Sequence, residues 1–369
     1  MEFTVQRNHL LSELNLVQGV IEKKSTIPIL SNILLEATGE RLDLTATDLD
    51  VSICCGCAAR VRREGTTTLS ARRLFDIVRL LPEDSSIDFG ILDNEWVGIR
   101  SGRSEYKVVG LPKENFPSIP EGGASPIDLP GALLRAMIER TMFAITQEES
   151  RYSLNGALIF LTASDIRMVA TDGHRLAMVS KAMEIPGVSG EIRALIPRKT
   201  LAEIQKLIGD RDLPVGFSRD ENHLFFSVGG KRLVSRILAG QFPNYEMVIP
   251  RDNDKTIVAA TRALTDGIRR TAVMSDEKLR AVRLAFQPGT VELTASSAEA
   301  GEAREVVPVE YQGDGLEIGF NPQYLLEFLA ACGSEQVAIS VKDSETQGML
   351  APDGAAELEY RYVVMPMKF

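Results

Sequence analysis

Three stretches of the chain repeat one order of apolar and polar positions. In 157–183 (ALIFLTASDIRMVATDGHRLAMVSKAM), short apolar runs alternate with polar turns, a pattern that predicts three consecutive strands. The stretch 33–53 (ILLEATGERLDLTATDLDVSI) places its turns in the same way and shares the sequence Ala-Thr-Asp. A third stretch, 279–307 (LRAVRLAFQPGTVELTASSAEAGEAREVV), follows the same order. The chain therefore repeats one strand-rich unit three times.

Helical patterns flank each strand-rich stretch. Leu10, Leu14 and Val17 recur at spacings of three and four, which places them on one apolar helix face. The predicted first helices are 7–21, 131–145 and 262–275, and the second helices lie within 68–82, 194–208 and 317–331. A repeat of about 120 residues is too long for a solenoid and has the size of a small domain. We therefore expect an α+β fold with three domains of one design, 1–120 (N-terminal), 121–250 (central) and 251–369 (C-terminal).

The composition argues against several classes of protein. The 369 residues are enough for several cores, and no apolar run approaches the roughly 18–20 residues of a membrane span. The N-terminal sequence lacks the apolar core of a signal peptide. Three of the four cysteines crowd at Cys54, Cys55 and Cys57, which is no disulfide framework and lacks a nearby second pair of metal ligands. We expect a cytoplasmic protein with no membrane segment, no metal site and no cofactor.

Basic residues recur on the predicted helices although the chain as a whole is acidic. The net charge of −10 argues against nucleic-acid binding through bulk charge. Three pairs of basic residues, each seven positions or two helical turns apart, share a helix face. For any single pair, an ordinary solvated face is the simpler interpretation. The recurrence favours a basic surface built from helices, while the sheets carry the negative charge. The pairs are Arg72 with Arg79, Lys199 with Lys206, and Arg262 with Arg269.

The sequence offers little for catalysis. Asp172 and His174 in ATDGHRL could form an acid–base pair, but Asp-Gly is also a common hairpin turn. The chain has three histidines, in unrelated segments, and no nucleophile elbow, zinc-protease motif, Walker A sequence or dinucleotide fingerprint. We therefore predict no catalytic residues.

The first and third repeats carry complementary features. Strand alternation puts Tyr106 and Val108 on one face of a basic segment in the first repeat. In the third repeat, Glu299, Glu302 and Glu305 concentrate acid within one segment. Two solvated strand edges would explain both observations. Alternatively, the two segments are halves of one head-to-tail interface, which closes into a ring when the rotation permits.

The order and spacing of several short segments resemble the family of bacterial DNA polymerase III β subunits, the sliding clamps. The resemblance covers essentially the whole chain. The segments that carry it are 3–5 (FTV), 26–30 (TIPIL), 101–104 (SGRS), 151–156 (RYSLNG), 169–176 (VATDGHRL), 196–199 (IPRK), 319–321 (GFN) and 362–367 (YVVMPM). It implies a head-to-tail homodimer that forms a closed ring, with helices inside and sheets outside. Such a ring encircles duplex DNA without reading its sequence, confers processivity on the replicative polymerase, and catalyses no reaction.

The same resemblance implies partners and assigns residues to three surfaces. The partners are double-stranded DNA, the DNA polymerase III catalytic subunit, the clamp loader, and other polymerases and repair proteins that carry short apolar peptide motifs. The DNA-facing residues are Lys24, Arg72, Arg198 and Lys199, to which the helix spacing adds Arg79, Lys206, Arg262 and Arg269. The dimer contact joins Arg103, Tyr106 and Val108 to Val273, Met274, Glu299, Glu302 and Glu305. The peptide-binding groove comprises Leu154, Thr171, Gly173, His174, Arg175, Leu176, Pro243, Val248, Asn321, Tyr324, Val363, Met365, Pro366 and Met367.

The chain departs from the family pattern at a few positions. Leu279 replaces an aromatic residue of some relatives and Met247 a basic one, so we expect the groove to persist with a different detailed preference. Glu148 and Ser153 stand where relatives can carry neutral polar or aromatic contacts to DNA. Two other hypotheses stay open: an enzyme that uses Asp172 and His174, and an interaction scaffold whose basic helix faces have no DNA role.

Overall fold

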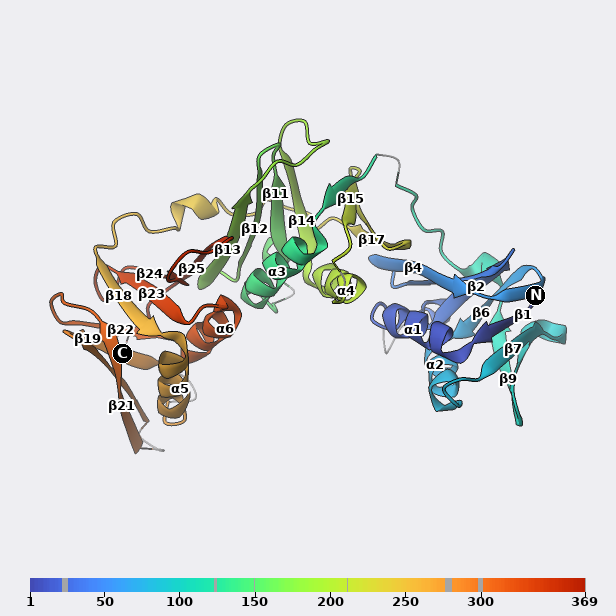
Figure 1. Ribbon diagram of the computed structural model, residues 1–369, viewed down its shortest axis with the longest axis horizontal. Coiled ribbons are helices and arrows are strands. Elements are labelled where there is room, and N and C mark those ends of the chain that lie inside the picture. Colours follow the sequence, from blue (N-terminus) through green and yellow to red (C-terminus); the bar gives the residue numbers. More distant parts are fainter. Residues whose placement is uncertain are drawn as a thin grey trace. The chain divides into compact units, whose positions relative to one another are not determined.

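The computed structural model describes residues 1–21, 26–122, 125–148, 150–210, 212–275, 281–297 and 301–368. Their contacts divide the chain into two compact units (Figure 1). Unit 1 comprises Met1–Arg135 and Lys199–Ile237, and unit 2 comprises Ala136–Arg198 and Leu238–Phe369. No helix in these ranges is long and apolar enough to cross a membrane.

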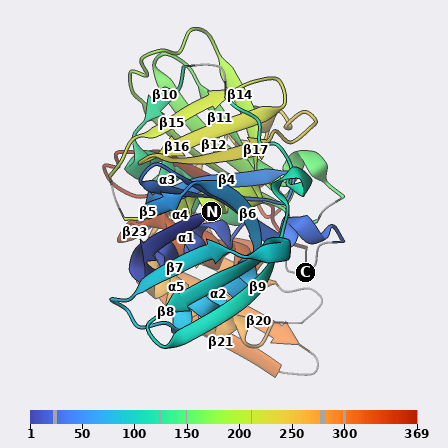
Figure 2. The same cartoon turned by 90° about the vertical axis from the view of Figure 1, so that its right-hand side faces the viewer.

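Unit 1 is built on one long antiparallel sheet, which has thirteen strands among the described residues. Figure 2 shows β15, β16 and β17 continuing into β4. At that junction Leu233 pairs with Ile53 and Val234 with Ser52. From edge to edge the strands are β10 (Ile127–Leu129), β15 (Val215–Arg219), β16 (His223–Val228), β17 (Lys231–Arg236), β4 (Val51–Ala58), β3 (Arg41–Thr47), β2 (Asn32–Thr38), β6 (Gly65–Ser70), β9 (Ser104–Leu111), β8 (Trp96–Ser101), β7 (Ser86–Ile91), β1 (Glu2–Gln6) and β5 (Arg60–Arg63).

The helices of unit 1 bury one apolar face each. They are α1 (Arg7–Val17), α2 (Ala71–Leu80) and α4 (Arg198–Ile208), which belongs to this unit from Lys199 onward. Leu10 and Leu14 of α1 and Leu74 of α2 are fully buried, as the helical periodicity predicts. Because α1 packs on β3 and β4 while α2 packs on α1 and β6, the core lies between these helices and the sheet.

Helix α1 ends at Val17, not at residue 21 as predicted. Gly19 follows, and glycine disfavours helix because it has the most backbone freedom to lose. A Cβ atom on Gly19 would lie only 2.3 Å from Oε2 of Glu203. The chain therefore leaves the helix at a residue that allows this close approach.

Unit 2 repeats the design with a second antiparallel sheet, which has twelve strands among the described residues. At the β13–β25 junction Leu176 pairs with Val363 and Ala177 with Tyr362. From edge to edge the strands are β14 (Ile192–Pro197), β11 (Gly156–Leu161), β12 (Asp165–Thr171), β13 (Arg175–Ala182), β25 (Glu359–Val364), β24 (Gly348–Pro352), β23 (Gln336–Val341), β18 (Lys255–Ala260), β21 (Gly301–Glu310), β20 (Thr290–Ser297), β19 (Val282–Gln287) and β22 (Leu316–Phe320).

Buried aromatic rings support the middle of unit 2. The helices here are α3 (Gly131–Thr141), from Ala136 onward, α5 (Thr261–Ala272) and α6 (Pro322–Cys332). Phe328 of α6 stacks on Tyr362 of β25, with ring centroids 4.9 Å apart. The hydroxyl group of Tyr360 donates a hydrogen bond of 2.8 Å to the carbonyl oxygen of Arg140 in α3. These contacts fix α3 and α6 to the strand that ends next to the candidate site.

The predicted repeat of three strands is confirmed: β2–β4, β11–β13 and β19–β21 are consecutive antiparallel strands. Two further predicted helices, besides α1, end early. Helix α3 ends at Thr141 instead of residue 145, and a 3₁₀ turn follows. Helix α5 ends at Ala272 instead of residue 275, because the next bonds, such as Met274 N–H to Thr271 O at 3.1 Å, tighten the last turn.

Residues of the predicted central domain, 121–250, occur in both units. The reason is strand pairing: β17 of this segment pairs with β4, and β13 pairs with β25. Each sheet therefore runs past a predicted domain boundary.

Candidate functional site

Three strands of unit 2 bring together sequence segments that lie far apart in the chain. The register pairs Thr171 of β12 with Leu176 of β13, and Leu176 with Val363 of β25. Directly paired residues point to the same face of a sheet, so these three side chains form one row. Tyr245, in a short 3₁₀ turn at Tyr245–Met247, packs in one buried cluster with Leu176 and Val363.

A pocket of about 110 Å³ opens over this row of side chains. Ten of the fourteen predicted groove residues line it, together with Tyr245. The predicted residues Asn321, Tyr324, Pro366 and Met367 do not line it. We call it the peptide pocket, and its lining residues are Leu154, Thr171, Gly173, His174, Arg175, Leu176, Pro243, Tyr245, Val248, Val363 and Met365.

The turn between β12 and β13 forms one wall of the peptide pocket. Oδ1 of Asp172 accepts backbone hydrogen bonds from His174 at 2.9 Å and from Arg175 at 3.0 Å. Gly173 has φ of 90°, a conformation that residues with a Cβ atom adopt with strain. Since the turn and the Arg175 side chain occupy the Asp172 carboxylate, this carboxylate is a structural group and not the base of an acid–base pair.

Arg175 fixes this wall to the rest of unit 2. Its guanidinium group is buried, pairs with Asp172 at 3.0 Å and with Glu327 of α6, and donates 2.6 Å to the carbonyl oxygen of Phe143. The group also lies over the ring of Tyr324, 4.3 Å from its centroid. Burial by itself lowers the pKa of Arg175, but Tyr362 and Glu327 outweigh it and raise that pKa above its ordinary value. Tyr324 does not line the pocket itself, but its ring contacts Arg175, which does.

The C-terminal segment is held on both sides by backbone hydrogen bonds. The Met365 N–H group donates 2.9 Å to the carbonyl oxygen of His174, and the Met367 N–H group donates 2.8 Å to that of Gly319. Met365 is nevertheless exposed, and Val248 is exposed across the pocket. The pocket rim is therefore apolar and accessible, while its floor is packed.

The predicted DNA-facing residues occupy two kinds of environment. Five of them project into solvent from α2, α4 and α5: Arg72, Arg79, Lys206, Arg262 and Arg269. Arg198 and Lys199, at the start of α4, are half-buried and bonded to backbone carbonyl oxygens of Ile145 (3.2 Å) and Val20 (2.7 Å), respectively. Lys199 also pairs with the buried carboxylate of Asp48. Lys24 lies outside the described residues.

The exposed basic side chains also differ in their counterions. Arg79 pairs with Asp76 at 3.4 Å, Lys206 with Glu203 at 2.7 Å, and Arg262 with Asp266 at 3.9 Å. Within the described part of the chain, Arg72 and Arg269 form no ion pair. These two guanidinium groups can therefore bind an external anion without breaking an internal pair.

The predicted dimer contact has an apolar half and an acidic half. On β9, Tyr106 is half-buried and Val108 is buried on the same strand face, while Arg103 is exposed at the preceding turn. Val273, just after α5, is 74% exposed, and Met274 is half-buried. The apolar residues fit an interface.

The described residues of the predicted acidic segment do not share one face of the sheet. Glu302 and Glu305 lie three positions apart on β21 and therefore point to opposite sheet faces. Oε1 of Glu305 pairs with Nε of Arg270 at 2.7 Å, and this contact lowers the pKa of the carboxyl group. Glu299 lies outside the described residues. In sequence the two glutamates are only three positions apart, and their separation becomes evident only once they are placed on a strand, where an odd spacing means opposite faces.

No group of three or more His, Cys, Asp and Glu side chains that could hold a metal ion occurs among the described residues. Cys55 and Cys57 share a face of β4, and burial raises the pKa of both thiols, that of Cys57 to about 11. They are protonated at neutral pH, whereas a metal ligand or nucleophile is the thiolate.

Sequence reasoning missed Tyr245. The signal that could have found it is the Phe-Pro motif that closes the first two repeats. Ile119 stands three positions after Phe116, and Tyr245 stands three positions after Phe242. An apolar residue at that position in both repeats indicates that it packs against the sheet.

Comparisons with known proteins agree along the whole chain. The family models described as the N-terminal, central and C-terminal domains of the DNA polymerase III beta subunit match residues 1–120, 128–244 and 246–368, respectively. The beta sliding clamp of Pseudomonas aeruginosa is 39% identical over the full length of both chains. A crystal structure of the DNA polymerase III subunit beta from that organism has a TM-score of 0.94 at 38% identity, with both chains fully covered. A further structure from the same organism, a sliding clamp bound to griselimycin, also has a TM-score of 0.94 at 38% identity and full coverage.

Proposed function

The chain belongs to the family of bacterial DNA polymerase III β subunits, and on this premise we propose how its surfaces serve the family's role. It has the three-domain sliding clamp fold and acts as a DNA sliding clamp for polymerase processivity. It is a processivity factor and not an enzyme. Its partners are DNA and a polymerase.

The peptide pocket is the site where we propose that partner proteins attach. A volume of about 110 Å³ suits one large side chain, since pockets for whole small molecules reach roughly 300–1,000 Å³. Burying such a side chain gains about 1.5–3 kcal/mol. The occupant is a short apolar peptide of the polymerase catalytic subunit, the clamp loader, or another polymerase or repair protein. The observation that carries this proposal is the packed row of Thr171, Leu176 and Val363 beneath an exposed apolar rim.

Titration with a short apolar peptide from the polymerase tail tests this proposal. Val248 lines the pocket and is 38% exposed, so Val248→Glu places a charge in the apolar site without disturbing the core. We expect the affinity to fall at least about tenfold, because truncated central anchors lose about 2 kcal/mol or more. Met247→Glu, at a neighbour that is 81% exposed and does not line the pocket, is the matched control. Equal affinities of the two variants would refute the assignment.

The DNA contact is proposed for the helix faces. Arg72 and Arg269 are exposed and lack counterions among the described residues. Arg79 and Arg262 stand on the same two helices, and Lys206 stands on α4. Contacts between such groups and phosphates require no base readout, so the protein can slide along the duplex. Arg198 and Lys199 belong to this proposal as partly engaged contacts, and Lys24 by resemblance.

The assembly is proposed to be a head-to-tail homodimer that closes into a ring around DNA. In each contact Tyr106 and Val108 of one copy meet Val273 and Met274 of the other, with Arg103 and the exposed Glu302 at the rim. The domains are 1–120, 121–250 and 251–369, and the place of action is the cytoplasm, where bacterial DNA lies. Such a contact buries the exposed side chain of Val273 and the exposed parts of Tyr106 and Met274, which otherwise face water.

A further inference from the structure

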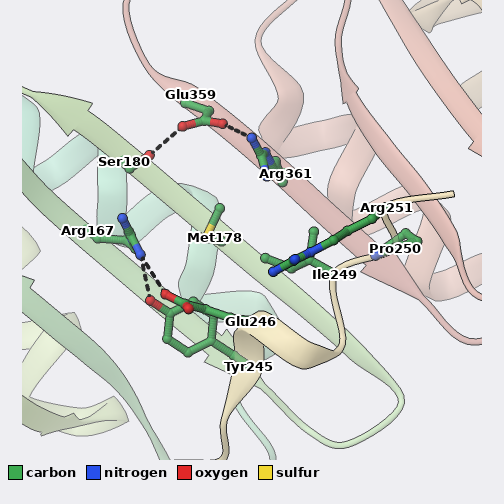
Figure 3. A pocket seen from close by; sticks show the side chains of 10 residues that line it. All are labelled: Arg167, Met178, Ser180, Tyr245, Glu246, Ile249, Pro250, Arg251, Glu359 and Arg361. Carbon is green, nitrogen blue, oxygen red and sulfur yellow. Dashed lines mark hydrogen bonds and ion pairs between the residues drawn. The ribbon is translucent and has the colours of Figure 1, made fainter. Parts of the chain in front are cut away.

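A second pocket lies on the same sheet face as the peptide pocket. Figure 3 shows the side chains that line it. Its volume is about 240 Å³. The register pairs Arg167 of β12 with Ser180 of β13, and Ser180 with Glu359 of β25. We call it the arginine pocket, and its lining residues are Arg167, Met178, Ser180, Tyr245, Glu246, Ile249, Pro250, Arg251, Glu359 and Arg361.

The two pockets are neighbours along the strands. The row Arg167–Ser180–Glu359 stands four residues along each strand from the row Thr171–Leu176–Val363. With about 3.3 Å per residue, the rows are about 13 Å apart. Tyr245 lines both pockets: its ring joins the buried cluster with Leu176 and Val363, and its hydroxyl group accepts a hydrogen bond of 2.9 Å from Arg167.

One of the three guanidinium groups of the arginine pocket has no ion pair among the described residues. Arg167 pairs with Glu246 at 3.3 Å and with Asp165, outside the pocket lining, at 3.5 Å. Arg361 pairs with Glu359, which also accepts a hydrogen bond from Ser180. Arg251 forms no ion pair with a residue that the structure describes. In Figure 3 its side chain reaches in from the segment after Pro250, with the guanidinium group turned towards the pocket. One cation therefore remains for an external anion.

We infer that the arginine pocket binds an acidic side chain of the same peptide whose apolar anchor fills the peptide pocket. This inference rests on the proposed function. An extended segment of about four residues spans the distance of about 13 Å, so the acidic residue stands about four positions from the anchor. A planar guanidinium group holds a carboxylate through two parallel hydrogen bonds. Partners with an acidic flank are thereby distinguished from partners with the apolar anchor alone.

The chemistry favours a carboxylate over a phosphate of DNA. A carboxylate and a phosphodiester each carry one negative charge, so Glu246 and Glu359 repel both alike, and the distinction rests on the apolar lining and on how the group is delivered. The apolar residues Met178, Ile249 and Pro250 also suit the methylene groups of an acidic side chain. A peptide that already occupies the peptide pocket brings such a side chain at high effective concentration.

The test uses the full-length protein and three versions of one apolar peptide. One carries a neutral Asn flank, one an Asp four residues before the anchor, and one an Asp four residues after it. Dissociation constants are measured for the unaltered protein, for Arg251→Gln and for Arg283→Gln. Arg283 pairs with Glu317 on the β19–β22 pair and lies in neither pocket, so its variant is matched in charge.

We expect one Asp peptide to bind the unaltered protein about threefold to tenfold more tightly than the neutral peptide. This gain disappears in Arg251→Gln, persists in Arg283→Gln, and shrinks at high salt because exposed charges are screened. In Arg251→Glu, a Lys in place of the Asp restores tighter binding.

Other outcomes separate this inference from the proposed function. If the neutral peptide binds but Asp adds nothing, or if the gain survives in Arg251→Gln, the inference is wrong and the peptide pocket stands. If the neutral peptide does not bind at all, the proposed function of the pocket fails and the inference fails with it. If Arg251→Gln weakens binding of a DNA duplex and not of the Asp peptide, the pocket binds phosphate and the inference is overturned.

Discussion

At the residue scale, the candidate site depends on buried charges that hold its wall in place. Arg175 contacts two carboxylates, a carbonyl oxygen and two aromatic rings, and these partners come from α6, from the turn before β13 and from the segment after α3. A buried ion that is satisfied on every side contributes to one defined geometry, and its removal leaves unpaired carboxylates behind.

Arg175→Ala is therefore expected to destabilise unit 2 by about 2–4 kcal/mol, because the partly buried carboxylates of Asp172 and Glu327 lose their buried partner. Thermal unfolding followed by circular dichroism measures the change. Arg304→Ala removes an exposed arginine that pairs with Glu292 and should shift the transition very little. Equal shifts for both variants would show that the Arg175 network is not structural.

The thiol group of Cys57 on β4 is expected to lower the stability of the protein at alkaline pH. Burial is the largest cause that raises the pKa of Cys57 to about 11, from an ordinary value of 9.0. Above pH 9 the thiol ionises in the unfolded chain while it stays protonated in the folded protein. The free energy of unfolding therefore falls as the pH rises from 9 towards 11. Melting temperatures measured between pH 8 and 10.5 should fall less in Cys57→Ala than in the unaltered protein, with Cys54→Ala as the control for loss of a thiol.

The family resemblance predicted most of the residues that line the peptide pocket, and sequence reasoning failed where a contact is distant in sequence. Two segments that carry the resemblance, 169–176 and 362–367, contribute residues to the pocket. The bond from Lys199 to Asp48 spans the sequence from the second repeat to the first, so Lys199 could not be distinguished from a solvated lysine. Glu302 and Glu305 look like a cluster until the strand separates them. The arginine pocket was missed because its residues come from three strands and a loop.

At the element scale, the exposed basic residues of the helices differ in whether a neighbouring carboxylate pairs with them. Each of the helices α2 and α5 exposes two arginines that are two turns apart, as the sequence predicts. In each pair one arginine has a counterion: Arg79 on α2 and Arg262 on α5. An arginine without a counterion binds phosphate at lower cost than one that must first leave a carboxylate.

Arg72→Gln and Arg269→Gln should each weaken binding to short DNA duplexes, equally for all sequences. Each neutralised contact lowers the slope of log K against log salt by about 0.9. Fluorescence anisotropy at several salt concentrations measures both quantities. Arg283→Gln, on a strand of the sheet, is the control and should leave the slope unchanged. A preference for one DNA sequence, or an unchanged slope in both variants, would contradict the proposed DNA contact.

At the scale of the whole molecule, the proposed ring depends on the contact between two copies. Tyr106→Glu combined with Met274→Glu should produce monomers, because unpaired charges in an interface cost about 2–5 kcal/mol. Val109→Glu is the control: Val109 neighbours Val108 on β9 but lies on the opposite strand face and is 47% exposed. Sedimentation measures the assembly, and retention on circular DNA, with release after the circle is cut, measures closure of the ring. A double variant that remains dimeric would refute the interface.

The junction between β17 and β4 has a mechanical consequence for unit 1. Since backbone hydrogen bonds join these strands, β17 cannot turn freely against β4. Any bending there must be shared as small changes of twist along the neighbouring strands, and it recovers elastically when the load is removed. We therefore expect unit 1 to resist bending as one continuous sheet, with the restoring force distributed over its strands.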